Sequence, residues 1–107
     1  MLNKYSLIIS PSARNDLRSI YEYISIDLHN KISADNLIRD FNNAFVRICY
    51  FPKSFPVINN EFLTHDLIRK KIVNNYIIFY LFIDDVVRIM RIVYSTRDYE
   101  NIVKKID

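Results

Sequence analysis

Glycine is absent from this chain of 107 residues. Phosphate-binding loops, dinucleotide-binding fingerprints and glycine-rich oxyanion turns all need backbone that carries no Cβ, so the sequence excludes these three kinds of site. The tight turns must instead use asparagine and aspartate, which tolerate a positive φ better than most other residues do.

Metal-binding and nucleophilic side chains are scarce. The sequence contains one cysteine, Cys49, and two histidines, His29 and His65. The histidines have no partners at the spacing of metal ligands, so we expect no metal site and no cofactor. Cys49 lies in an apolar helical stripe, which favours a buried, unreactive thiol over a catalytic one.

Long apolar runs are also missing. The longest, Tyr76–Ile83, has the length of a strand and is too short to span a membrane. Pro11 follows the first ten residues too closely for a signal peptide, so we expect a cytoplasmic protein with no membrane partner. Hydrophobic residues make up 50% of the chain and charged residues 25%, which is a globular composition, and we expect residues 1–107 to form one domain.

Positive charge gathers in one part of the chain. The net charge is +3, and residues 65–97 hold six lysines and arginines against three aspartates. This excess favours an anionic partner, either nucleic acid or an acidic protein segment. Ordinary solvated charges on strands are the alternative interpretation.

Three strands joined by two tight turns are predicted in the C-terminal part of the chain. Ile, Val, Phe and Tyr fill most positions there, and these residues pack well on a pleated surface. The turns are expected at Asn74-Asn75 and Asp84-Asp85. The strand between them, Tyr76–Ile83, is apolar on both faces, which indicates a central strand covered on both sides. The last strand is expected over Val86–Tyr94.

Two amphipathic helices are predicted before these strands. Ser10 is a good N-cap and Pro11 suits the first helical position, so the first helix is expected over Pro11–Leu28. Ser33 is expected to cap the second helix, which Pro52 must end. Its apolar stripe follows a 3.6-residue period and comprises Ala34, Leu37, Ile38, Phe41, Ala44, Phe45 and Ile48.

A short strand, Lys4–Ile9, precedes the helices, so the predicted order is β-α-α-β-β-β. This order indicates an α+β fold in which a helical hairpin packs on one face of a small, mainly antiparallel sheet. Residues 98–107 are expected to form a short helix or to fray. The face of the middle strand away from the helices needs cover from this tail or from a partner. The apolar residues expected on this face are some of Ile77, Phe79, Leu81 and Ile83.

Four segments resemble the RelE/ParE superfamily of toxins from bacterial type II toxin–antitoxin systems. They appear in the superfamily's order and cover nearly the whole chain. They are SPSARNDLRSIYEYI at Ser10–Ile24, Phe51-Pro52, IRKKIVNNYIIFY at Ile68–Tyr80, and RIMRIVYSTRD at Arg88–Asp98.

The resemblance implies one of two activities. RelE-like members are ribosome-dependent endonucleases that cleave mRNA, whereas ParE-like members poison DNA gyrase. Members of both branches are neutralised by a cognate antitoxin in a hetero-oligomer. A chain with this fold that only binds its antitoxin is a third alternative.

The endonuclease residues are incomplete in this sequence. RelE-like members carry an arginine directly after the aromatic residue that opens the middle strand, and here Tyr76 is followed by Ile77. Isoleucine cannot donate hydrogen bonds to a scissile phosphate. Lys70 matches one member of a basic pair, but Ile68 occupies the position of the other. The catalytic set implied by the endonuclease alternative is Lys70, Tyr94, Arg97 and Tyr99.

The ParE-like branch is therefore favoured, with no enzymatic site of the chain's own. Tyr94 also stands where many relatives carry histidine, which weakens acid–base chemistry at that position. The resemblance places the gyrase-binding surface on the last strand and the tail. The expected target-binding residues are Arg69, Arg91, Tyr94 and Arg97.

Overall fold

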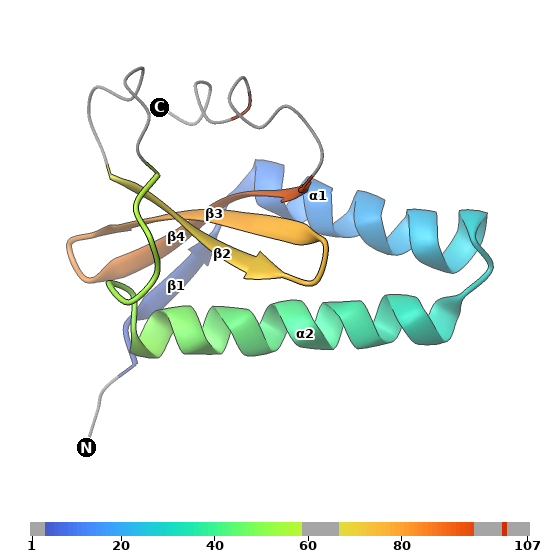
Figure 1. Ribbon diagram of the computed structural model, residues 1–107, viewed down its shortest axis with the longest axis horizontal. Helices are drawn as coiled ribbons and strands as arrows, with labels where there is room; N and C mark the ends of the chain where they lie inside the picture. Colours follow the sequence, from blue (N-terminus) through green and yellow to red (C-terminus); the bar gives the residue numbers. More distant parts are fainter. Residues whose placement is uncertain (1–3, 59–66, 96–101, 103–107) are drawn as a thin grey trace.

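A computed structural model of the chain describes residues 4–58, 67–95 and 102. It confirms the α+β fold, with two helices on one face of a four-stranded sheet (Figure 1). The elements in chain order are β1 (Ser6–Ile9), α1 (Pro11–Glu22), the π-helical segment η1 (Tyr23–Asp27), α2 (Lys31–Tyr50), β2 (Ile68–Val73), β3 (Tyr76–Ile83) and β4 (Val86–Tyr94).

The strand order in the sheet is β1-β4-β3-β2. β3 is antiparallel to both of its neighbours, and β1 is parallel to β4, with Ser6 in register with Val86. The predictions of a mainly antiparallel sheet and of a central middle strand are therefore confirmed.

A β-bulge interrupts the pairing of β3 with β4. Tyr80 pairs with Ile89 and Phe79 pairs with Arg91, so Met90 is the extra residue on β4. Because of this insertion, Ile89 and Ile92 both face the helices although they are three positions apart.

Polar side chains begin both helices. The Ser10 hydroxyl accepts a hydrogen bond from the Ala13 N–H at 3.0 Å, which confirms the first predicted cap. The prediction that Ser33 caps the second helix is wrong, because the Asn30 side chain accepts from the Ser33 N–H at 3.1 Å and α2 begins at Lys31. Asparagine is as good an N-cap as serine, so the helix starts earlier than the sequence pattern indicated.

The apolar residues form two buried clusters, one on each face of the sheet. The larger cluster joins both helices to the near faces of β3 and β4, and it contains Phe41, Ile48 and Tyr80. The smaller cluster covers the far face, where Ile77 and Phe79 are buried. Three partly buried apolar residues pack against this far-face cluster: Ile58, Met90 and Ile102.

The far face of β3 therefore has cover within the chain. The tail helix expected over residues 98–107 lies outside the described residues except for Ile102, which is helical and packs on this face. Ile83 lies at the end of the strand and is more than one-third exposed.

Asparagine and aspartate make the tight turns, as predicted for a chain without glycine. Positive φ angles occur at Asn74 (53°), Asp84 (54°) and Asp85 (62°), and at His29 (51°) between the helices. Cys49 is buried at 1% exposure, and burial raises the pKa of its thiol, which confirms the prediction of a buried cysteine. No helix in the described part of the chain is long and apolar enough to cross a membrane.

Candidate functional site

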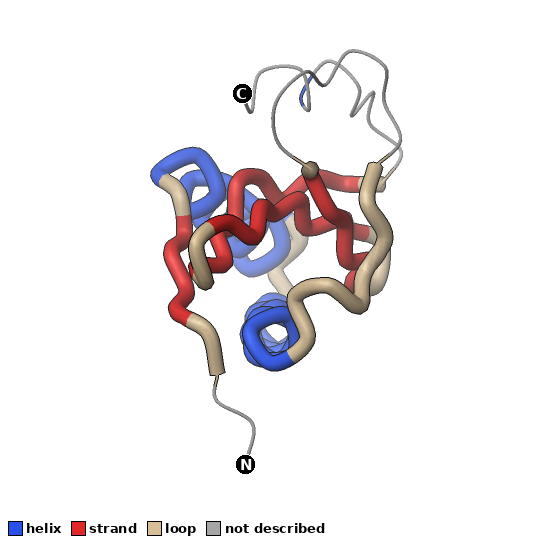
Figure 2. Tube along the Cα trace, turned by 90° about the vertical axis from the view of Figure 1, so that its left-hand side faces the viewer, coloured by secondary structure: helices blue, strands red, loops and turns tan. Residues whose placement is uncertain are grey.

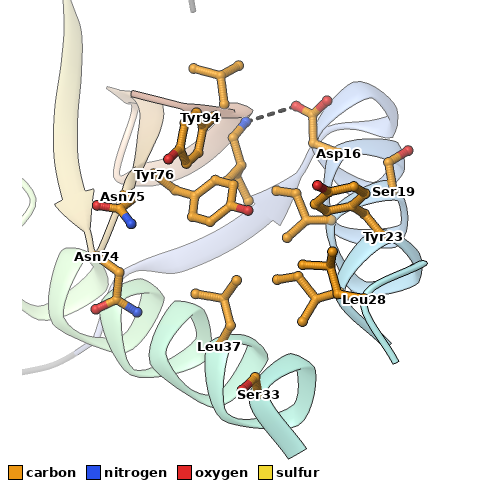
Figure 3. A pocket seen from close by; sticks show the side chains of 14 residues that line it. Asp16, Ser19, Tyr23, Leu28, Ser33, Leu37, Asn74, Asn75, Tyr76 and Tyr94 are labelled. Carbon is orange, nitrogen blue, oxygen red and sulfur yellow. Dashed lines mark hydrogen bonds between the residues drawn. The ribbon is translucent and has the colours of Figure 1, made fainter. Parts of the chain in front are cut away.

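An open groove of about 750 Å³ lies between the helical hairpin and one end of the sheet (Figure 3). The late turns of α1, η1 and the first turns of α2 form one side. The turn between β2 and β3 and the end of β4 form the other. The apolar residues lining it are Ile20, Ile24, Leu28, Leu37, Ile92 and Val93.

Three tyrosines line the groove: Tyr23, Tyr76 and Tyr94. The rings of Tyr76 and Tyr94 meet edge to face with their centroids 5.4 Å apart, and Tyr76 also meets Phe41 at 5.6 Å. Burial, with smaller contributions from Tyr94 and Tyr23, raises the pKa of Tyr76. Its hydroxyl therefore stays protonated near neutral pH and offers a neutral hydrogen-bonding group.

An ion pair closes one side of the groove. Asp16 on α1 accepts hydrogen bonds from Arg91 Nε at 2.8 Å and from Arg91 Nη2 at 3.1 Å. The Asp16 Oδ2 atom also accepts from the backbone N–H of Ile92 at 2.8 Å. The hydrogen bond to Asp16 raises the pKa of Arg91. The pair fixes α1 to β4 just before Tyr94.

The sequence-predicted target-binding residues fall into three groups. Tyr94 lines the groove and is 42% exposed. Arg91 is bound to Asp16, and Arg69 donates from Nη1 to the carbonyls of Phe55 at 2.8 Å and Lys53 at 3.3 Å. Arg97 lies outside the described residues.

Two of the four residues of the endonuclease alternative, Lys70 and Tyr94, lie in the described part of the chain. Lys70 is half-buried on the edge strand β2, whereas Tyr94 is at the far end of β4 beside the groove. Tyr99 and Arg97 lie outside the described residues. Ile77, at the position where endonucleases carry arginine, is 5% exposed and belongs to the far-face cluster.

The groove lining is suited to binding. Among the described residues that line the groove, Asp16 and the three tyrosines are the only ionisable ones. The Asp16 carboxylate is already paired with Arg91. No group of three or more His, Cys, Asp and Glu side chains in the described part could hold a metal ion. Apolar side chains, tyrosine hydroxyls and asparagine amides remain to contact a ligand.

Sequence reasoning missed several residues of this site. The sequence patterns assign no role in this site to Asp16, Tyr23 or Tyr76. Asp16 and Arg91 are 75 positions apart, so no local pattern links them. The one available signal was the position of Tyr94 at the end of a predicted strand.

Comparisons with known proteins agree with this architecture. No curated protein matches the sequence. The fold is similar to that in the chromosomal ParDE toxin–antitoxin system from P. aeruginosa, with a TM-score of 0.69 and 16% identity over 85% of this chain and 96% of that one. It is also similar to the toxin–antitoxin complex RelBE2 from Mycobacterium tuberculosis, with a TM-score of 0.58 and 17% identity over 91% of this chain and 98% of that one.

The sequence itself matches the family described as "ParE toxin of type II toxin-antitoxin system, parDE" over residues 7–99. This range contains all the elements from β1 to β4 except the first residue of β1. The chain therefore belongs to the ParE toxin family of type II toxin–antitoxin systems.

Proposed function

We propose that this toxin inhibits growth by binding DNA gyrase, without a catalytic site of its own, and that a cognate antitoxin neutralises it. The observation that carries the proposal is the ParE family match over residues 7–99, together with the apolar, buried Ile77 where an endonuclease arginine is expected. A buried isoleucine offers neither charge nor hydrogen bonds to a phosphate in its transition state.

The groove is the surface that we assign to the target. Its lining combines exposed aromatic rings with apolar side chains, and aromatic anchors in a pocket supply most of the energy in many protein interfaces. Tyr94 is one of two exposed tyrosines of this lining, with Tyr23, and Arg97 follows Tyr94 three positions later in the sequence. We assign Tyr94 and Arg97 to target contact.

Arg69 and Arg91 receive a different role in this proposal. Both guanidinium groups already bind within the chain, Arg91 to a carboxylate and Arg69 to two carbonyls. Releasing them to contact a partner would cost these charge-assisted hydrogen bonds. We therefore assign them to shaping the surface that carries Tyr94.

The antitoxin is the second expected partner. Both similar structures belong to toxin–antitoxin systems, in which a toxin is paired with an antitoxin. We propose that this chain likewise forms a hetero-oligomer with its antitoxin.

Induced expression in bacteria tests the proposal. Gyrase inhibition predicts a DNA-damage response while protein synthesis continues, and purified chain should block supercoiling of relaxed plasmid by gyrase. Rapid arrest of translation with cut mRNA would instead support the ribosome-dependent endonuclease. No growth defect would support a chain that only binds its antitoxin.

A matched pair of variants tests the role of the groove. Tyr94→Ala should reduce toxicity at least tenfold, whereas Tyr50→Ala should leave it unchanged. Tyr50 is a suitable control because it is similarly exposed, at 38% against 42% for Tyr94, and lies outside the groove. Equal toxicity of the two variants would contradict the assignment.

A further inference from the structure

The two edges of the sheet are protected to very different degrees. A loop lies along the edge strand β2: the N–H of Ile58 donates to the carbonyl of Ile68 at 2.7 Å, and the N–H of Lys70 donates to the carbonyl of Pro56 at 3.0 Å. β2 also carries three consecutive cations, Arg69–Lys71. Figure 2 shows this loop beside the strands on one side of the sheet, opposite the strand that leads to the N-terminus. Covered backbone and charged side chains are the usual protection of an edge strand.

β1 forms the other edge and lacks these features. Its sequence, Ser6–Ile9, is uncharged, and it pairs with β4 alone. The N–H of Ser10 donates to Ile89 of β4 at 2.9 Å. Because successive backbone groups of a strand alternate in direction, the N–H groups of Leu7 and Ile9 point away from β4, toward the open side.

Two contacts mark the limits of this open stretch. At one end, the N–H of Tyr5 donates to the carbonyl of Cys49 on α2 at 3.1 Å. At the other end, Arg14 Nε donates to the carbonyl of Ile9 at 3.2 Å. Between them, the N–H groups of Leu7 and Ile9 have no hydrogen-bond partner among residues 4–58, 67–95 and 102.

The side chains around this edge are apolar and accessible. Leu7 is 38% exposed on the helix side, and Val46 of α2 is 46% exposed. Both line a shallow hollow of about 260 Å³ between β1 and α2. Ile8 is 44% exposed on the opposite face, in register with Arg88 of β4.

Arg88 supplies a charge beside this edge. Its side chain is exposed and makes no ion pair with another residue in the described ranges. Arg14 lies at the Ile9 end of the same edge. A strand added here would therefore meet apolar surface on its helix side, and a cation on its other face.

We propose that the open edge of β1 accepts an extended segment of the antitoxin, in which bulky apolar residues alternate with carboxylates. The segment extends the sheet through the N–H groups of Leu7 and Ile9. Its apolar side chains pack against Leu7 and Val46, and a carboxylate on the other face pairs with Arg88. This inference depends on the proposed antitoxin partnership and adds the site and chemistry of the contact.

A second copy of the chain fits this edge poorly. Two β1 strands paired about a two-fold axis would bring two Arg88 side chains toward the same ribbon, and Ser6–Ile9 supplies no carboxylate to neutralise them. The apolar residues around the edge are also few, compared with roughly 20–30 residues on each side of a stable protein interface.

Hydrogen exchange of the full chain, alone and with the product of the small reading frame beside its gene, tests the inference. In the free chain, the amides of Leu7 and Ile9 should exchange faster than that of Ile8. In the complex, both should exchange at least tenfold more slowly. Arg88→Glu should weaken the complex at least tenfold without changing the fold, whereas Arg47→Glu, an exposed arginine on α2, should have little effect.

Three outcomes would overturn the inference, and they are distinguishable. A complex that leaves the exchange of Leu7 and Ile9 unchanged would place the antitoxin elsewhere and leave the proposed partnership intact. Absence of a complex would remove the partnership and this contact together. A dimer of the chain alone, with these two amides protected, would assign the edge to a second copy.

Discussion

Asp16 binds Arg91 through both of its carboxylate oxygens and, through one of them, the backbone N–H of Ile92. The first residue is on α1 and the other two are on β4, directly after the bulge at Met90. One carboxylate thus holds the helix against an irregular strand end. Because Tyr94 lies two residues beyond Ile92, this contact also sets the rim of the groove.

Asp16→Asn should destabilise the protein by about 2 kcal/mol, because it weakens charge-assisted hydrogen bonds and leaves the partly buried Arg91 without a counter-charge. Urea unfolding measures the change. Asp35→Asn is the control, since the pair between Asp35 and Lys31 is exposed and such pairs contribute less than about 1 kcal/mol. Equal losses for the two variants would contradict the structural role of Asp16.

The carboxyl group of Asp35 should titrate below the ordinary range of an aspartate. Hydrogen bonds from Lys31 at 2.9 Å and from the Tyr21 hydroxyl at 2.8 Å lower its pKa. A pKa depressed by folding stabilises the protein above the unfolded-state value, and that contribution is lost as the pH falls through the folded-state value. Carboxyl NMR titration measures the pKa. Lys31→Met should raise it, and an unchanged value would contradict the role of Lys31.

Tyr80→Phe should destabilise the protein by about 1–2 kcal/mol. The buried Tyr80 hydroxyl donates to the carbonyl of Pro52 at 2.7 Å, and the variant leaves that carbonyl without its donor. Urea unfolding measures the loss, with Tyr50→Phe as the exposed control. A loss as small as that of the control would show that the Pro52 carbonyl finds another partner.

Tyr80 should also make stability depend on alkaline pH. Burial raises its pKa to about 12, above the value of an ordinary tyrosine. Between about pH 10 and pH 12 the unfolded chain releases this proton while the folded chain keeps it, so stability falls as the pH rises. In Tyr80→Phe, the slope of the unfolding free energy against pH should be smaller by the contribution of about one proton. The same slope in both proteins would contradict the assignment.

Filling the groove should abolish target binding without unfolding the protein. Ser19 is exposed on α1 and lines the groove, so Ser19→Trp places an indole in its mouth. Ser12 is exposed on the same helix outside the groove, and Ser12→Trp is the matched control. Growth inhibition should be lost for the first variant and retained for the second, with equal thermal stability. Full toxicity of Ser19→Trp would place the target contact elsewhere.

Asp85→Gly should stabilise the protein by about 0.5–1 kcal/mol. Asp84 and Asp85 both have positive φ, at 54° and 62°, and glycine adopts such angles without the steric cost of a Cβ. Thermal unfolding measures the gain. Asp85→Ala should lower stability, since alanine keeps the Cβ and loses the polar side chain. A gain for both variants would mean that the aspartate is unfavourable for another reason.

Much of the fold could be predicted from the sequence because its strongest signals are local. The apolar stripe that contains Leu37 and Phe41 marks α2, and the asparagine and aspartate pairs mark both turns. Ser10 and Pro11 mark the start of α1 because capping depends on residues only three positions apart.

The candidate site could not be predicted to the same extent, because its contacts join distant residues. The bulge at Met90 changes which residues of β4 face the helices, and period-two alternation gives no sign of it. Arg69 binds two loop carbonyls, and Arg91 binds a carboxylate on another element. Their positive charge therefore predicted contact with a partner, whereas the structure shows that both arginines bind groups within the chain.

The pairing of β1 with β4 has a consequence during synthesis. These strands come from the two ends of the described chain, and Ser6–Ile9 has no strand to pair with until Val86–Ile89 has been made. Contacts between such distant segments form late in folding. A nascent chain truncated by a premature stop before β4 lacks both the partner of its first strand and the cation that Asp16 binds. Such fragments should be degraded, so the groove rim that carries Tyr94 arises only once a molecule is nearly finished.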